Sequence, residues 1–297
     1  MLSADKKQKF DAIQSSYSRA ELIWLHGFLT GSLFPATTLP SLVAVPAQNK
    51  TLSGTIISKI NLHDTGSAGQ THHIEIEAPG ASYNPGDYIS FSINNSPNAT
   101  GKKRYPVSSS PEAHSGEIHV TIPADIEELV CDKPVEFLIH ADGKFAPPEE
   151  NTDLIMIGSG AGIAPFRSLL SHRDATGASG RNWLFFGEKN FISDFLYQTD
   201  LQLWAETGGL TRMNTAFTDE KMALAQKILI HAKEIINWLN HGAHLYINTA
   251  AENELQEVIG AFRDIDRQNN TNPGKPSSIS INELEKQGRY QAQWFGQ

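Results

Sequence analysis

The chain has 297 residues, enough for two domains of ordinary size, and 39% of them are hydrophobic. Its formal net charge of -9 and its lack of a Lys/Arg-rich run predict no nucleic-acid partner and no attraction to anionic membrane surfaces. The single cysteine, Cys131, excludes an intrachain disulfide and the Cys spacing of a zinc site, so we expect a cytoplasmic protein without a bound metal.

Residues 1–50 are predicted to form a helical hairpin followed by an extended linker. Ser18 and Glu21 match a capping box at the start of the second helix, and leucines recur at helical spacing after it. The hairpin either packs on the body of the protein or serves as a docking element. The apolar stretch that begins at Leu22 ends at Pro35, so it is too short to span a bilayer, and no signal-peptide core precedes it.

Residues 51–150 are predicted to form an antiparallel β-barrel domain. Short β-rich runs, several of them alternating, are separated there by Gly, Pro and Asn. These runs read "GTIISKINL", "HHIEIEA", "DYISFSI", "EIHVTI" and "PVEFLI". Short strands at this spacing are typical of a barrel.

Residues 151–297 are predicted to form an α/β domain with a doubly wound parallel sheet. Buried-strand runs alternate with helical segments, one of them a long helix through Trp238. The strand runs are "LIMIGSG", "NWLFFG", "LTRMNTAF" and "AHLYINT". A polar loop is expected at residues 267–278.

The segment "IMIGSGAGIAPFR" places three glycines, Gly158, Gly160 and Gly162, after the first strand of that domain, with Pro165 just inside the next helix. Glycines let the backbone approach a pyrophosphate closely, and the free amides of the helix start can solvate its charge. The strand, turn and helix context favours a dinucleotide site over a purely structural turn.

The motifs "GSGAGIAPFRSLL", "NWLFFGEKNFISDFLYQTDL", "GGLTRMNTAF", "GAHLYINTA" and "GRYQAQWF" occur in the order found in the ferredoxin-NADP reductase superfamily. The chain more narrowly resembles the flavoprotein subunits of NADPH-sulfite reductase, over nearly its whole length. The resemblance implies FAD and NADH or NADPH as cofactors. The family's flavodoxin-like domain has no counterpart, so no FMN is expected, and residues 94–102 replace its connecting insertion.

In this family an Arg-x-Tyr-Ser segment holds the flavin. The matching positions here are Lys103 for the phosphate-binding Arg, Tyr105 for the stacking ring and Pro106 for the Ser hydroxyl. The resemblance also carries cofactor-binding roles to Arg104, Val107, Ser108 and Arg167, and it makes Phe295 the aromatic that covers the flavin. Pro106 supplies neither a hydroxyl nor a backbone N–H.

Two further positions of the family's polar hydride-transfer set are also substituted. Asn248 replaces the Cys of its Cys-Gly-Asp motif, and Gln293 replaces the Asp before the terminal aromatic. Together with Pro106, these substitutions predict slow hydride transfer, because polar groups placed for the transition state supply much of the rate.

The phosphate-binding positions also depart from the family pattern. Asp125, Glu127 and Glu128 stand about where the FAD diphosphate would lie, and they predict weak FAD binding through charge repulsion. Thr218 and Asp219 follow the strand "LTRMNTAF", where NADP-preferring relatives have a Ser-Arg pair. Asp219 would accept from a ribose hydroxyl, which favours NADH, or it belongs to a solvated acidic turn.

Two functions therefore remain open. In the first, the chain is an NAD(P)H:flavin oxidoreductase that passes electrons through FAD to a sulfite reductase hemoprotein or a flavodoxin-like partner. In the second, it is a non-catalytic reductase-fold protein that binds or scaffolds a redox partner. The N-terminal helices resemble a region used for subunit assembly, so a homo-oligomer is possible.

Overall fold

The computed structural model describes residues 51–92, 103–141, 144–270 and 277–295. The predicted N-terminal hairpin and linker lie outside these residues, as does the 271–276 part of the expected polar loop. The described residues all belong to one compact unit. In this part of the chain, no helix has the length and apolar character that crossing a membrane requires.

The first sheet is antiparallel, with six strands in the order β4-β3-β6-β1-β2-β5. They are β1 (Leu52–Asn61), β2 (His72–Glu77), β3 (Tyr88–Phe91), β4 (Tyr105–Pro106), β5 (Glu117–Ile122) and β6 (Pro134–His140). A bridge between Val107 and Val120 connects the chain just after β4 to β5, the opposite edge strand. The sheet is therefore a nearly closed barrel, which confirms the sequence prediction.

Alternation along β2 shows why these residues form a barrel wall. Ile74 and Ile76 are 1% and 0% exposed and belong to the barrel core. His73 and Glu75 occupy the alternate positions and point to the other face of the strand. The barrel thus has an apolar interior and, on β2, a polar outer face.

The second sheet is parallel throughout, in the order β11-β10-β7-β8-β9. Its strands are β7 (Leu154–Ser159), β8 (Asn182–Glu188), β9 (Arg212–Phe217), β10 (His244–Thr249) and β11 (Tyr290–Trp294). Between β6 and β7 the chain passes residue 150, where the division into two domains stays a prediction.

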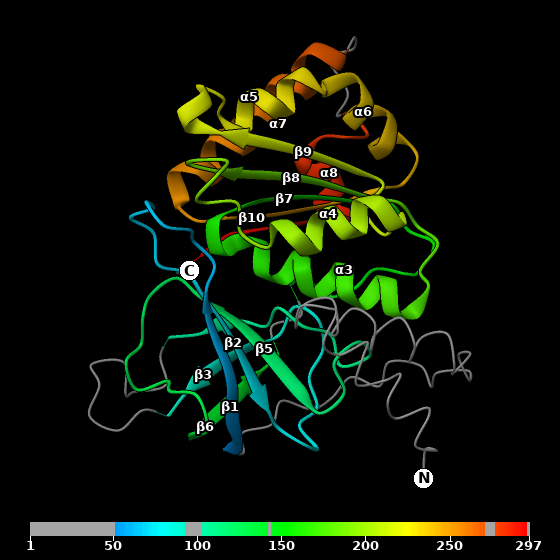
Figure 1. Cartoon of the computed structure of the whole chain (residues 1–297). Helices are drawn as coiled ribbons and strands as arrows, with labels where there is room; N and C mark the ends of the chain where they lie inside the picture. The colour runs from blue at the N-terminus through cyan, green and yellow to red at the C-terminus, as the bar shows by residue number, and fades with distance from the viewer. Residues whose placement is uncertain (1–50, 93–102, 142–143, 271–276, 296–297) are drawn as a thin grey trace, which may run out of the picture. The chain divides into compact units, whose positions relative to one another are not determined.

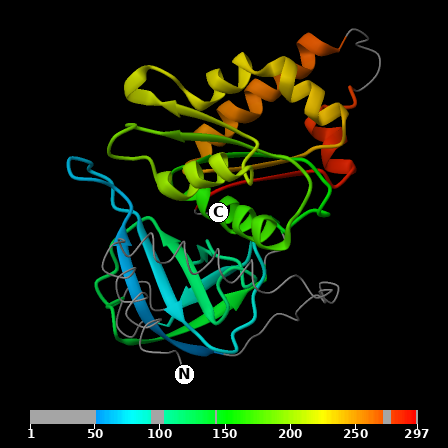
Figure 2. The same ribbon diagram turned by 45° about the vertical axis from the view of Figure 1, so that its right-hand side comes forward.

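Helices cover both faces of the parallel sheet (Figures 1 and 2). One face carries α3 (Ala164–Thr176) and α4 (Gln198–Thr207), and the other carries α5 (Leu224–Ile230), α6 (Ala232–Asn240) and α7 (Glu252–Asn269). Trp183 and Phe185 of β8 pack with the second group, whereas Leu184 and Phe186 pack with the first. This confirms the predicted α/β class. The short helix α8 (Ile281–Lys286) precedes β11.

The prediction of a single long helix through Trp238 was wrong. Helices α5 and α6 meet at His231, whose backbone angles of φ -97° and ψ 13° lie outside the α-helical region. The His231 Nε2 lies 3.0 Å from Asn214 Nδ2 on β9, so the ring is held against the sheet where the helix breaks.

Candidate nucleotide and flavin site

The glycine turn lies between β7 and α3, at the carboxyl end of a parallel strand, and it includes the 3-10 helix η1 (Gly160–Ile163). Gly160 has φ +49°, in the left-handed region that favours glycine. A Cβ added at Gly162 would lie 2.2 Å from the main-chain oxygen of Asn248. Pro165 is in the first turn of α3, where its missing N–H costs nothing. Backbone conformation therefore accounts for Gly160, and close packing accounts for Gly162.

Two partly buried carboxyl groups lie beside this turn. Ser159 donates its hydroxyl to Glu254 Oε2, and the Ser159 Oγ accepts from the Ala250 amide at 2.9 Å. A Cβ added at Gly160 would lie 3.4 Å from Glu188 Oε1. Burial raises the pKa of both Glu188 and Glu254. A pyrophosphate at the turn would bring negative charge next to these groups, which opposes its binding.

The substituted hydride positions are bound into the protein structure. The Asn248 Nδ2 donates to the Gly162 carbonyl at 3.0 Å, and Gln293 donates its side-chain amide to the Tyr88 hydroxyl. Pro106 is a strand residue of β4, paired with Tyr88 of β3. The three positions thus hold β10, β11 and the barrel in place.

The predicted flavin platform is closed. Tyr105 is only 2% exposed, and its ring centroid lies 5.9 Å from that of Phe91. The Lys103 Nζ lies 5.7 Å from the Tyr105 ring centroid, and Phe295 packs against the same barrel core. A flavin can stack only on an open ring face, and these neighbours leave Tyr105 almost none. Arg104 is exposed.

The next residues, Val107 and Ser108, are buried, and the main chain of Ser108 joins the barrel to α3. The Arg167 Nη1 donates to the Ser108 carbonyl at 2.6 Å, and its Nε donates to Asp200 Oδ2 at 2.7 Å. Burial alone would raise the pKa of Asp200, but Arg167 lowers it below the ordinary value. Arg167, which the resemblance assigned to cofactor binding, is used in this structure to hold Ser108 and Asp200.

The acidic residues expected beside the FAD diphosphate lie in a turn without helix. Asp125 Oδ1 lies 2.6 Å from Lys59 Nζ, which also donates to the Ile126 carbonyl at 2.8 Å. Glu127 and Glu128 are exposed, while Ile126 and its neighbour Leu129 belong to the barrel core. This segment therefore packs into the barrel through Ile126 and Leu129.

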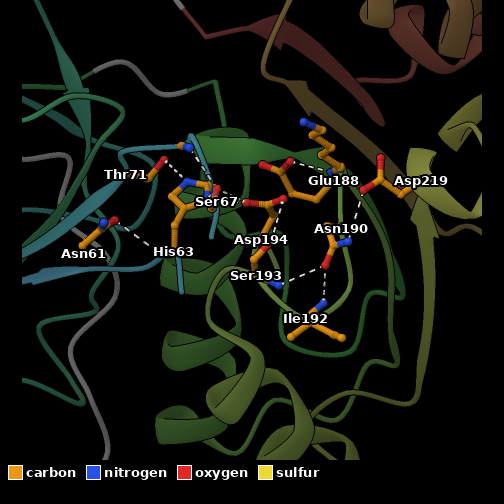
Figure 3. A network of polar contacts seen from close by, with 12 residues as sticks. Asn61, His63, Ser67, Thr71, Glu188, Asn190, Ile192, Ser193, Asp194 and Asp219 are labelled. Atoms are coloured by element: carbon orange, nitrogen blue, oxygen red, sulfur yellow. Dashed lines mark hydrogen bonds and ion pairs between the residues drawn. The ribbon is translucent and has the colours of Figure 1, made fainter. Parts of the chain in front are cut away.

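Thr218 and Asp219 begin a 3-10 turn, η2 (Thr218–Glu220), directly after β9, and both are exposed. The Asn190 Nδ2 donates to Asp219 Oδ2 at 3.1 Å, and the Asp219 amide donates to the Lys189 carbonyl at 3.0 Å. Figure 3 shows the hydrogen bond between Asn190 and Asp219. Asp219 is thus at the carboxyl edge of the sheet, directly after β9, with a carboxylate that can accept a hydrogen bond.

The same view contains a network that sequence reasoning missed (Figure 3). His63, in the loop after β1, places its Nδ1 2.8 Å from Asp194 Oδ1, in the loop after β8. Ser67 also donates to Asp194, and the Asp64 amide donates to the Ser193 carbonyl at 2.9 Å. Burial opposes ionisation of Asp194, yet hydrogen bonds from Ser67 and His63 lower its pKa. No local pattern reveals this link, because His63 and Asp194 are 131 positions apart.

As the structure places them, these residues do not fit a bound FAD. The ring expected to stack on the flavin is closed, and the segment expected at the diphosphate is packed into the barrel end. The glycine turn keeps the backbone geometry of a nucleotide site, but carboxyl groups stand beside it.

Comparison with known proteins relates the chain to redox enzymes. Residues 156–248 match the oxidoreductase NAD-binding domain family. The sulfite reductase [NADPH] flavoprotein alpha-component of Bacillus subtilis is 31% identical over 208 residues, which cover 63% of this chain and 34% of that protein. The corresponding protein of Vibrio vulnificus is 40% identical over 169 residues, 56% of this chain and 27% of that protein. This chain therefore spans about a third of the length of these relatives or less.

Among solved structures, a ferredoxin-NADP+ reductase from Plasmodium falciparum aligns with a TM-score of 0.65 at 20% sequence identity, covering 82% of this chain and 96% of that one. This likeness shows the fold: a nearly closed barrel followed by a parallel sheet between helices. The chain is therefore a relative of the sulfite reductase flavoprotein alpha-components, with an oxidoreductase NAD-binding domain match over residues 156–248.

Proposed function

We propose that this chain works in a sulfite-reductase-type electron-transfer system as a partner-binding protein with a reductase fold, and that it does not itself carry out hydride transfer. The observation that carries the proposal is the closed flavin platform, because Tyr105 is 2% exposed and packs with Phe91 in the barrel core. Without an open ring face, the flavin that accepts the hydride in this family has no stacking surface.

The residues at the hydride positions support the same conclusion. Hydride transfer gains rate from polar groups aimed at the charge that develops in the transition state. Here the amide of Asn248 is committed to the Gly162 carbonyl and that of Gln293 to Tyr88. Pro106 has no polar side chain at all. Removing one such group typically costs about 100-fold in rate, so the loss of the set removes practical catalysis.

The relatives support a role with a partner. They are named alpha-components of a reductase, a name that implies a further component. We propose that the partner of this chain is a sulfite reductase hemoprotein or a flavodoxin-like protein. The contacts between the barrel and α3, through Arg167 and Ser108, would keep the reductase fold intact for such binding.

The second candidate function is an NAD(P)H:FAD oxidoreductase that passes electrons to the same partner. The specific observation in its favour is Asn248 Oδ1, a buried acceptor that has no hydrogen-bond partner in the described part of the chain. It lies at the end of β10, beside the glycine turn, where an amide of a nicotinamide could donate to it. For this candidate we propose NADH over NADPH, since Asp219 would repel a 2'-phosphate.

Absorption spectroscopy of the purified full chain separates the two candidates. We expect no flavin bands as isolated and none retained after incubation with FAD and gel filtration. A chain that retains stoichiometric FAD, reduced by NADH faster than by NADPH, would establish the oxidoreductase instead. Sedimentation of the chain with a purified sulfite reductase hemoprotein, and separately with a flavodoxin, tests partner binding. A chain that is colourless and sediments independently of both contradicts the proposal.

A further inference from the structure

A group of polar side chains on the outer face of the barrel is not among the candidate site residues above. His73 and Glu75 are two positions apart on β2, and Glu117 and His119 are two positions apart on β5, so each pair points to one face. The strand pairing places Glu75 directly opposite His119, which brings the two pairs together. His114, just before β5, has its ring centroid 4.2 Å from that of His119. We name these five residues the histidine cluster.

The spacing of the cluster suits the coordination of one small cation. His73, Glu75 and His119 each offer a ligand atom within 4.8 Å of the others, and so do His114, Glu117 and His119. The His73 Nε2 lies 3.5 Å from Glu75 Oε1, and the His119 Nε2 lies 3.2 Å from Glu117 Oε2. Two ligands of a tetrahedral zinc ion, each at about 2.0 to 2.1 Å from the metal, are separated by about 3.3 Å. The separation between His73 Nε2 and Glu75 Oε1 is close to this value.

A second, independent observation points to a missing ligand. The His119 side chain is 4% exposed, and within the described residues its Nδ1 is buried without a hydrogen-bond partner. Leaving a buried polar atom unpaired is costly. With Glu117 at Nε2, the remaining nitrogen of His119 has a lone pair that a cation can use. A carboxylate that accepts from the far nitrogen of a metal-bound histidine is a common arrangement in metal sites.

The neighbouring contacts orient the other histidine in the same way. The His73 Nδ1 lies 2.9 Å from the Tyr197 hydroxyl, which itself lies 2.6 Å from Thr121 Oγ1. A His73 that donates Nδ1–H to Tyr197 presents the lone pair of Nε2 toward Glu75. Tyr197 precedes α4, so the hydrogen bond joins the barrel to the helical layer.

The charges around the cluster also favour a divalent cation. Glu75 and Glu117 would bring two negative charges to a divalent ion. The nearby positive charge of Arg167 is offset by its own ion pair with Asp200. The side chains of Glu75 and Glu117 are 26% and 38% exposed, which gives an ion access from solvent.

We propose that the histidine cluster binds one divalent transition-metal ion of the zinc class, held by His73, Glu75 and His119, with His114 and Glu117 completing or orienting the set. Imidazole and carboxylate together suit zinc, whereas an all-oxygen set would suit calcium or magnesium. The expectation of no metal from the sequence considered cysteine spacing, and this site uses two adjacent antiparallel strands instead.

The test uses the full chain with any affinity tag removed, dialysed against a chelator and titrated with zinc chloride in competition with a chromophoric chelator. We expect one equivalent of tight binding and a rise in Tm on adding zinc, because the metal binds the folded state. The variants Glu75→Gln and His119→Gln should each weaken binding at least about tenfold and abolish the rise in Tm. Cobalt(II) in place of zinc should give the visible bands of a four-coordinate nitrogen and oxygen site.

His241→Gln is the matched control, because His241 is exposed and, among the described residues, its ring bonds to the Asn237 carbonyl one turn away. Glu75 is partly exposed, so Glu75→Gln decides the matter if His119→Gln does not fold. Absence of tight binding to the wild-type chain overturns the proposal. So does an affinity in Glu75→Gln equal to that of His241→Gln, which would assign the zinc to surface histidines.

Discussion

The two halves of segment 103–110 differ in what holds them. In the second half, the carbonyls of Ser108 and Ser109 accept from Arg167 and Ser168 of α3. In the first half, Tyr105 and Pro106 are packed in the barrel, where the family would present a ring and a hydroxyl to the flavin. Contacts that join the two sheets are thus present while those for cofactor chemistry are absent, which teaches that the fold does not depend on the cofactor positions.

The largest expected effect concerns the second half of the segment. Arg167→Met should lower the free energy of unfolding by about 3 kcal/mol, because it leaves Asp200 and the Ser108 carbonyl without their partner in a largely buried place. Urea unfolding followed by circular dichroism measures the change. Arg267→Met is the control, since Arg267 is 79% exposed in its pair with Asp264 and should change stability by less than about 1 kcal/mol. If both variants lowered the free energy of unfolding equally, the contacts of Arg167 would contribute no more to stability than an exposed surface pair.

The glycine turn provides the next test. Gly162→Ala should destabilise the protein by about 1 to 3 kcal/mol, because its Cβ would lie 2.2 Å from the Asn248 oxygen. Gly260→Ala, in α7 with no atom within 4 Å of the new Cβ, should stabilise it by about 0.5 to 1 kcal/mol. Thermal unfolding of both variants gives the answer. A neutral Gly162→Ala would mean that packing does not require this glycine.

A smaller effect is expected at acid pH for Glu112, which lies just after segment 103–110 and accepts from Ser110 at the end of that segment. Burial alone would raise the pKa of Glu112, but hydrogen bonds from His172 and Ser110 lower it to about 2. The contribution of a lowered carboxyl pKa is present above the unfolded value of about 4.3 and is lost as pH falls toward 2.

The free energy of unfolding should therefore fall over that range by about 1 kcal/mol more in the wild type than in Glu112→Gln, allowing for partial exposure of Glu112. Urea titrations at several pH values between 2 and 6 measure the difference. Parallel pH profiles would show that Glu112 is not tied to Ser110 and His172 in solution.

The smallest effect is expected at the barrel end. Asp125→Asn removes a surface pair with Lys59, so stability should change by less than about 1 kcal/mol. FAD affinity, measured by fluorescence titration, should stay negligible, because Ile126 and Leu129 still fill the barrel end. Appearance of FAD binding in this variant would show that charge alone excludes the flavin, and that the packing described here does not.

Much of the fold could be predicted from local patterns. Alternation identified the strands of the barrel, and the glycine run after a buried strand identified the start of the parallel sheet. The break between α5 and α6 could not be predicted, because it coincides with a contact of His231 to Asn214 across the sheet. Helical periodicity on its own continues through that position.

The candidate site was less predictable for the same reason. The substitutions at Pro106, Asn248 and Gln293 were visible in the sequence, but their new partners were not, since Gln293 and Tyr88 are 205 positions apart. The closure of Tyr105 involves Phe91 of β3, and Phe295 from the far end of the chain packs against the same core. Which residue types occupy a site can thus be predicted from the sequence, whereas what they contact requires the fold.

The hydrogen bonds that hold α3 to the barrel are accepted by the main-chain oxygens of Ser108 and Ser109. Every amino acid carries such an oxygen, so mutation at either position leaves the acceptor in place. Substitutions in the barrel segment alone would therefore seldom remove these two hydrogen bonds. An ancestral reductase could in this way change its chemistry one side chain at a time while its two halves stayed attached.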